Sequence, residues 1–237
     1  MGEITNLAGV IRVHGAAQGD KTALILGERS LSWSELRDRS ARAAQGLLAA
    51  GVAEQERVAF LDKNGFEHFE IMFGAAMINA VCVDVNWRLA APEVEFIVND
   101  TEAKVLVVGP DFVPILDAIA DNLTHVTSVV VIGGHERFRD YEEWITSFDP
   151  IDPGTDSALD DVAFQLYSSG TTGRPKGVML TNANFFSLLP MAKELWELTP
   201  DSVNLVAMPL FHIAGGGWAV AGMYEGCTSI IFRDLDP

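Results

Sequence analysis

Hydrophobic positions along this chain fall into short apolar runs separated by longer stretches with helical spacing. The short runs predict strands at residues 22–26, 31–33, 57–61, 81–85, 104–108 and 128–132. The longer stretches predict helices at residues 34–50, 66–79 and 111–122, and another that Pro92 opens. Because strands alternate with helices of ten or more residues, we predict an α/β fold whose sheets are mostly parallel and covered by helices.

The first of the long helices has a recognisable start and stop. Ser34 lies just before the periodic positions and carries a hydroxyl that can cap a helix, and Gly51 follows the last of these positions. The two short runs before this helix, on either side of residues 27–30, predict a small hairpin.

The segment at residues 149–161 is the best candidate for a boundary between two domains. It reads DPIDPGTDSALDD, and its two prolines, one glycine and five aspartates are poorly suited to a core or to a strand. We therefore predict a first α/β subdomain at residues 1–160 and the start of a second at residues 161–237, which would carry the polar loop described below.

Composition and charge narrow the class of protein. Hydrophobic residues make up 49% of the 237 residues, which predicts a globular chain with a sizeable core. The net charge of −17 argues against nucleic acid or an anionic membrane as a partner and predicts an acidic, solvated surface. The N-terminus has no basic start followed by a long apolar run, so we expect no targeting segment and a cytoplasmic location.

Two apolar features need a separate explanation. Residues 205–224 have the length of a membrane span, with His212 as their only ionisable group. Pro209 and four glycines interrupt them, and no Lys/Arg cluster flanks them, so we predict a strand, a loop and a helix, and no integral membrane segment. Cys82 and Cys227 both lie in apolar runs, which predicts buried thiols rather than a disulfide or a metal site.

The most informative polar segment is the loop YSSGTTGRPKGV at residues 167–178, between two apolar runs. Its glycines let backbone N–H groups converge on an anion, its hydroxyls add donors, and Lys176 adds a positive charge. This pattern favours polyphosphate binding, with ATP as the expected ligand, although Gly- and Ser-rich turns are often plain surface loops. The common phosphate loop, G-x-x-x-x-G-K-[ST], fits poorly because Gly177 follows Lys176.

The order of residues in this loop resembles a known signature. SSGTTGRPKG is similar to the motif of the adenylate-forming superfamily, which includes acyl-CoA synthetases, aryl-CoA ligases, luciferases and the adenylation domains of peptide synthetases. Residues 74–89 resemble the helix, strand and N-x-R-L segment of acyl-CoA synthetases, with that last motif at Asn86 to Leu89. Asn79 stands where glycine is typical, which should be tolerated because Asn accepts left-handed backbone angles, and Asp84 stands where proline is typical.

A third segment resembles the motif that lines the acyl pocket in this superfamily. It reads MPLFHIAGG at residues 208–216, with His212 where members that activate amino acids commonly carry an aspartate for the substrate's ammonium group. The missing anion argues for a carboxylic acid with an apolar tail. His212 then resembles the catalytic residue near the substrate carboxylate and the thiol channel, although it could also be a histidine satisfied within a core loop.

The resemblance implies a set of site residues. The residues expected to bind the ATP phosphates are Ser168, Ser169, Gly170, Thr171, Thr172, Gly173 and Lys176. The residues expected to form the acyl pocket are Phe211, His212, Gly215, Gly216 and Trp218. The two glycines would leave room for a chain or a ring, and Trp218 would form a wall of the pocket or simply pack in the core. No residue is assigned to a metal, and Mg²⁺ is expected to bridge phosphate oxygens of ATP.

The activity implied is that of an ATP-dependent acid–thiol ligase, an acyl-CoA synthetase. Such an enzyme would activate a carboxylic acid, here expected to be a fatty acid, as its acyl-adenylate and transfer it to coenzyme A. The class of acyl chain stays open, as does the choice between CoA and a carrier protein. The likeness covers only the front half of a typical member, so we expect this chain alone not to be competent. The alternative is a non-catalytic module that binds a nucleotide or a protein, or that forms a homodimer through exposed sheet edges.

Overall fold

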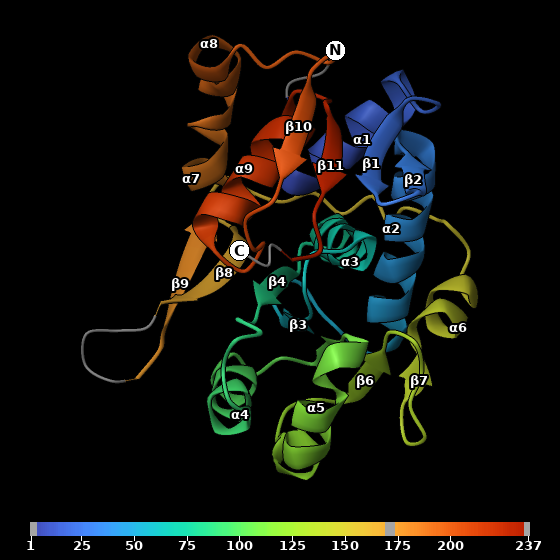
Figure 1. Ribbon diagram of the computed structural model, residues 1–237, viewed down its shortest axis with the longest axis vertical. Coiled ribbons are helices and arrows are strands. Elements are labelled where there is room, and N and C mark those ends of the chain that lie inside the picture. The colour runs from blue at the N-terminus through green and yellow to red at the C-terminus, as the bar shows by residue number, and fades with distance from the viewer. Residues whose placement is uncertain (1–3, 169–173, 235–237) are drawn as a thin grey trace.

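The computed structural model describes residues 4–168 and 174–234, and two sheets form its centre (Figure 1). The strands of the larger sheet are β3 (Arg57–Leu61), β4 (Val81–Asp84), β5 (Val105–Val108), β6 (Ser128–Val131), β7 (Arg139–Asp140), β8 (Val162–Ser168) and β9 (Lys176–Thr181). They lie in the order β7-β6-β5-β3-β4-β8-β9. The strands of the smaller sheet are β1 (Thr22–Leu26), β2 (Arg29–Ser32), β10 (Val203–Val206) and β11 (Thr228–Ile231), in the order β10-β11-β1-β2.

Neighbouring strands run parallel in both sheets except within two hairpins, β1–β2 and β8–β9. The helices that flank the sheets are α1 (Leu7–Ala17), α2 (Trp33–Ala49), α3 (Phe66–Met77), α4 (Ala91–Asp100), α5 (Val113–Ile119), α6 (Tyr141–Thr146), α7 (Asn182–Phe186), α8 (Ala192–Trp196) and α9 (Ile213–Tyr224). The predicted α/β fold with mostly parallel, helix-covered sheets is therefore confirmed.

The centre of the larger sheet is buried on both faces. Val58 and Phe60 of β3 belong to a core shared with α2 and α3, whereas the intervening Ala59 and Leu61 belong to a second core shared with α4 and α5. Successive side chains of a strand point to opposite faces, so a strand covered on both sides is apolar at every position. This is why the short apolar runs predicted the strands well.

Some helix predictions need correction. The helix expected at residues 111–122 is split into a 3₁₀ turn (Pro110–Phe112), the short α5, and a second 3₁₀ turn (Ala120–Asn122). The segment contains Pro114, which lies in the first turn of α5, where its missing N–H costs no hydrogen bond. The sequence pattern does not predict α1, whose N-cap Asn6 accepts a hydrogen bond from the Gly9 N–H over 2.7 Å.

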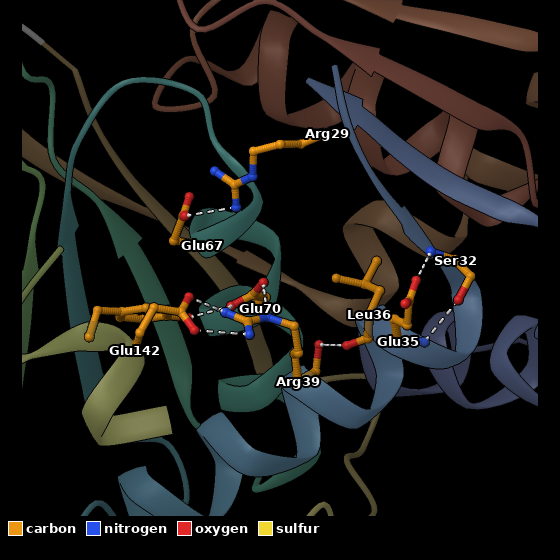
Figure 2. Close-up of polar contacts among 10 residues, drawn as sticks. Arg29, Ser32, Glu35, Leu36, Arg39, Glu67, Glu70 and Glu142 are labelled. Atoms are coloured by element: carbon orange, nitrogen blue, oxygen red, sulfur yellow. Dashed lines mark hydrogen bonds and ion pairs between the residues drawn. The ribbon is translucent and has the colours of Figure 1, made fainter. Parts of the chain in front are cut away.

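The start of α2 also differs from the prediction. Its N-cap is Ser32, whose hydroxyl accepts from the Glu35 N–H, while the Glu35 carboxylate accepts from the Ser32 N–H over 2.7 Å (Figure 2). Ser34 is instead inside the first turn, and its hydroxyl donates to the Gly19 carbonyl over 2.9 Å. The spacing of Ser32 and Glu35 is that of a capping box, and this pair indicated the start of the helix better than Ser34 alone.

The two departures from the family pattern have clear structural consequences. Asn79 adopts a left-handed backbone with φ of 56°, as expected, and its amide donates to the carboxylates of Glu54 and Asp161. Asp84 is buried at the end of β4, where its Oδ2 lies 2.8 Å from Nε2 of the buried His68. The carboxylate that replaces the usual proline is thus paired inside the core.

Both sheets contain strands from each side of residue 160. β8 and β9 extend the larger sheet beyond β4, and β11 lies beside β1 of the smaller sheet. The acidic segment at 149–161 is held in place, since Arg12 pairs with Asp152 over 2.7 Å and donates to the Thr155 carbonyl. The division into subdomains at residue 160 stays a prediction.

The apolar stretch at 205–224 comprises the end of β10, a loop and α9, as predicted. Within the described ranges, no helix combines the length and the apolar character that crossing a membrane requires.

Candidate functional site

The loop expected to bind phosphate connects β8 and β9 at the edge of the larger sheet (Figure 1). Ser168 and Lys176 lie opposite each other as the described pair nearest the loop, and both are exposed. The assigned residues Ser169, Gly170, Thr171, Thr172 and Gly173 lie outside the described residues. The two strands therefore bring the first and the last of the assigned phosphate residues together.

This hairpin continues past the strand beside it. β4 ends at Asp84, which lies opposite Leu166 of β8. Tyr167 and Ser168 extend further and pair with β9. The tip of the hairpin, defined here as residues 167–168 and 176–177, therefore projects beyond the end of β4 (Figure 1).

An apolar pocket of about 670 Å³ lies beside the same hairpin. Its walls come from β9, from the segment that contains α7 and α8, and from α9, and none of the described residues that line it is charged. They are Leu180, Asn184, Phe185, Ser187, Leu188, Leu189, Trp196, Ile213, Ala214, Gly217, Trp218 and Ala221. A mostly apolar cavity of this size suits a small molecule with an apolar body.

Trp218 lines the pocket, as one of its two proposed roles requires. Its ring lies 5.4 Å from that of Trp196, nearly perpendicular to it, and its Nε1–H donates to the Leu205 carbonyl over 3.1 Å. The indole is half-buried, so one edge is fixed by the hydrogen bond while the other contributes to the pocket wall.

His212 is exposed and caps α9. The Ala214 N–H donates to His212 Nδ1 over 3.1 Å. Because Nδ1 accepts this hydrogen bond, a neutral imidazole carries its proton on Nε2. His212 is thus not enclosed in a core loop, and its Nε2 is available for other contacts.

Gly215 and Gly216 are buried and serve close packing. A Cβ atom at Gly215 would lie 2.1 Å from the Pro209 carbonyl oxygen, and one at Gly216 would lie 2.9 Å from the Leu210 carbonyl oxygen. Neither glycine is among the described residues that line the apolar pocket, whereas the neighbouring Gly217 is. Their visible role is to let α9 approach the preceding loop.

Phe211 brings two of the family-like segments together. Its ring lies 6.0 Å from that of Trp87, at nearly a right angle, and the Arg88 guanidinium carbon lies 5.6 Å from the Phe211 ring. Arg88 also stacks on Trp87 at 4.2 Å. The segment containing N-x-R-L is therefore in contact with the MPLFH segment, and Phe211 lies there rather than in the apolar pocket.

Several pocket residues were not predicted from the sequence. Leu180, Phe185, Trp196 and Ile213 come from four separate elements or loops, and only the fold brings them together. Ile213 directly follows His212, so its position next to the assigned motif was the available signal. The apolar run of β9, Val178 to Leu180, gave no indication of which face Leu180 would occupy.

The two cysteines are free and buried, as predicted, and burial raises the pKa of both thiols. In the part of the chain that the structure describes, no group of three or more His, Cys, Asp or Glu residues is placed to hold a metal ion.

Comparison with known proteins identifies relatives of this chain. A fatty acid–[acyl-carrier-protein] ligase, ScoC, from Streptomyces coeruleorubidus is 32% identical across 98% of this chain and 44% of its own length. A feruloyl-CoA synthase from an Amycolatopsis species is 34% identical across 91% of this chain and 42% of its own length. The structure of a Mycobacterium tuberculosis fatty acyl CoA synthetase, 28% identical, superposes with a TM-score of 0.89 across 98% of this chain and 45% of that one.

This chain spans less than half the length of these relatives. The model of one family, described as AMP-binding enzyme, matches residues 11–237. The match covers nearly all of the sequence, including the loop, the N-x-R-L segment and the MPLFH segment. The chain belongs to the AMP-binding enzyme family of adenylate-forming ligases.

Proposed function

We propose that the protein carrying this chain is an ATP-dependent acid–thiol ligase that activates a carboxylic acid with an apolar tail. The observation that supports this best is the position of the apolar pocket. Leu180, in the strand that Lys176 begins, lines the pocket. One hairpin therefore has the loop that we propose to bind phosphate at its end and an apolar wall along its side, which suits a reaction that joins an apolar acid to a nucleotide.

The proposed reaction has two steps. A carboxylate oxygen attacks the α-phosphorus of ATP, a new P–O bond forms, and pyrophosphate leaves with the electrons of the broken P–O bond. The sulfur of a thiol, from CoA or from a carrier protein, then attacks the acyl carbon. A C–S bond forms, the acyl C–O bond breaks, AMP leaves with that electron pair, and the thiol proton is released. Both steps depend on positioning and on the stabilisation of negative charge.

The chain's own groups fit the first step. The Lys176 ammonium and the Ser168 hydroxyl can bind phosphate oxygens of ATP, together with the loop between them. We propose that Mg²⁺ reaches the site bound to those phosphates and neutralises part of their charge. His212, through its Nε2, is the proposed contact to the substrate carboxylate or the incoming thiol.

The pocket also suggests which acids are used. None of its described lining residues is an anion, and the residue after Phe211 is histidine, so an α-ammonium group would find no partner there. We therefore propose a fatty acid as the substrate. The two relatives named above carry the names of a fatty-acid ligase and of a feruloyl-CoA synthase, so an aryl acid is the comparison to make.

The test is carboxylate-dependent exchange of labelled pyrophosphate into ATP by the full protein that carries this chain. Exchange that rises with octanoate or longer fatty acids, and not with leucine, is the expected outcome. Equal stimulation by leucine, or no stimulation by any carboxylate, would contradict the proposal.

The alternative of a non-catalytic binding module has one feature in its favour. Val203 and Leu205 of the edge strand β10 are 63% and 53% exposed, so this edge could take up a partner protein or a second copy. Stable self-association in solution without pyrophosphate exchange would favour this alternative over the ligase.

A further inference from the structure

The face of the β8–β9 hairpin opposite the apolar pocket carries polar side chains to which the phosphate and acyl assignments give no role. Gln165 and Tyr167 of β8 lie on this face, opposite Met179 and Gly177 of β9. These four residues line a second cleft, of about 300 Å³, together with Arg57 of β3 and residues 100–102 at the end of α4. The hairpin thus has the apolar pocket on one face and this cleft on the other.

Side-chain contacts hold the hairpin on both sides of this cleft. The Tyr167 hydroxyl donates to Asp100 Oδ2 over 2.6 Å. On the other side, Arg57 Nε donates to Gln165 Oε1 over 3.2 Å, and Arg57 Nη2 lies 3.4 Å from Met179 Sδ. Burial and the Asp100 carboxylate raise the pKa of Tyr167, and the Gln165 side chain opposes that rise. The contacts therefore link a guanidinium on β3, through the hairpin, to a carboxylate at the end of α4.

Gly177 makes this arrangement possible. It lies opposite Tyr167 on β9, and a Cβ atom there would be 2.8 Å from Gln165 Nε2 and 3.2 Å from Tyr167 Cζ. The tyrosine ring therefore occupies the space that a side chain at Gly177 would need. This gives the last glycine of the loop motif a role in packing, separate from phosphate binding.

We propose that Tyr167 and Asp100 are positioning residues for the phosphate-binding loop, an inference that rests on the proposed function. Pairing between β8 and β4 stops at Leu166, so the tip projects without β4 beside it. Tyr167 directly precedes Ser168, and Gly177 directly follows Lys176. A charge-assisted hydrogen bond at this point fixes the tip relative to α4, and with it the two residues that begin and end the phosphate site.

The experiment compares Tyr167→Phe and Asp100→Ala with Glu102→Ala in the full protein that carries this chain. Glu102 lines the same cleft and is exposed, and its carboxylate makes no hydrogen bond or ion pair with a described residue, so it controls for the loss of a nearby carboxylate. The first readout is amide hydrogen exchange of residues 176–181. We expect the exchange rate to rise about fivefold in both test variants and to be unchanged in the control. The double variant should show the same rise of about fivefold as each single variant, because both substitutions remove one contact.

The second readout is the KM for ATP in pyrophosphate exchange. We expect it to rise by a similar factor of about five in the two test variants, with the KM for the carboxylate unchanged. Unchanged hydrogen exchange in the test variants would overturn the proposal. Faster hydrogen exchange combined with a KM for ATP equal to that of the control variant would overturn it as well. If the wild-type protein shows no carboxylate-dependent exchange, the proposed function fails by itself. Hydrogen exchange and direct titration with MgATP then still decide whether the Tyr167–Asp100 contact positions the loop.

Discussion

At the scale of single residues, His212 has an observed structural role and a proposed chemical role, and each uses a different ring nitrogen. Its Nδ1 accepts the Ala214 N–H and caps α9, while Nε2 is available to a substrate. An N-cap contributes about 1 kcal/mol to stability. Any replacement that loses the cap therefore mixes a folding effect with an effect on the reaction.

The variant His212→Asn separates these two roles, because asparagine is a strong N-cap but has no imidazole. We expect His212→Ala to lower the free energy of unfolding by about 1 kcal/mol, and His212→Asn to change it by less than about 0.5 kcal/mol. Both should reduce ATP- and carboxylate-dependent thioester formation to the same extent. Urea unfolding and product formation measure the two effects, and a fully active Asn variant would show that the ring acts only as a cap.

Lys176 and Arg174 provide a matched pair of exposed cations on either side of Pro175. Lys176 lies in β9 opposite Ser168, whereas Arg174 precedes the strand. We expect Lys176→Ala to weaken MgATP binding by tenfold or more, about 1.4 kcal/mol, and Arg174→Ala to change it little. Nucleotide titration of both variants measures this. Equal losses would mean that overall charge near the loop, rather than a specific contact from Lys176, determines binding.

At the scale of the elements, the start of α2 shows that two serines only two residues apart can have different roles. Ser32 and Ser34 both precede the periodic part of α2, and both hydroxyls make hydrogen bonds. Of the two hydroxyls, only that of Ser32 accepts from a free N–H of the helix, that of Glu35, and the Glu35 carboxylate accepts in return from the Ser32 N–H (Figure 2). The Glu35 carboxylate is largely exposed, so burial affects it little. Its hydrogen bonds with the backbone and side chain of Ser32 therefore lower the pKa of Glu35.

The variant Ser32→Ala should therefore destabilise the protein by about 1 kcal/mol through loss of the cap. Ser34→Ala removes the hydrogen bond to the Gly19 carbonyl and the 3.2 Å contact with the Ser32 hydroxyl, but leaves the cap in place, and should cost less, about 0.5 kcal/mol. Since the folded pKa of Glu35 is lowered, its contribution is present near neutral pH and is lost as the pH falls through the lowered value. Urea denaturation of both variants at pH 7 tests the order, and a larger cost for Ser34→Ala would contradict it.

Strands could be predicted from the sequence more reliably than helix ends or the pocket. The run Arg57–Leu61 coincides with β3 because a strand buried on both faces is apolar along its length. The loop proposed to bind phosphate could be singled out because the residues of its motif are contiguous. The pocket was not, because Leu180, Trp196 and Ile213 are far apart in sequence and each is one apolar residue among many. Their shared location depends on how α8 and α9 pack, which local patterns do not contain.

At the scale of the whole molecule, one arginine joins three helices. Arg39 of α2 bonds to Glu70 of α3 over 2.6 Å and to Glu142 of α6 over 2.5 Å (Figure 2). The Tyr141 hydroxyl also donates to Glu70. The Glu70 side chain is 1% exposed, whereas that of Glu142 is 56% exposed. The two ion pairs share a cation but lie in different surroundings.

Removing each carboxylate should therefore have different effects. Glu70→Gln leaves a partly buried guanidinium and a buried hydroxyl with weaker acceptors, and we expect a loss of about 3 kcal/mol. Glu142→Gln removes an exposed pair and should cost about 0.5 kcal/mol. Thermal and urea unfolding at pH 7 measure both losses. Similar values would show that Arg39 and Glu70 are solvated in solution.

The same pair of variants tests a dependence on pH. Burial raises the pKa of Glu70, so between the ordinary value of 4.5 and the raised value the folded state holds a proton that the unfolded state has released. The contribution of Glu70 to stability therefore decreases as the pH rises through that window. Glu70→Gln should lack this slope, and Glu142→Gln should retain it.

The two sheets connect the beginning of the chain with its end, and this bears on whether residues 1–160 form an independent unit. Without later residues, β4 would lose β8 as its neighbour, and β1 would lose β11. The hairpin β1–β2 would then be a two-stranded ribbon, which is marginally stable by itself, and the edge of β4 would be open. We expect the fragment 1–160 to show no cooperative thermal transition by circular dichroism, while the 237-residue chain unfolds in one. A fragment that melted cooperatively near the transition temperature of the whole chain would instead support a domain boundary at residue 160. Such a result would show that residues 1–160 already form a complete core, to which the later strands are added.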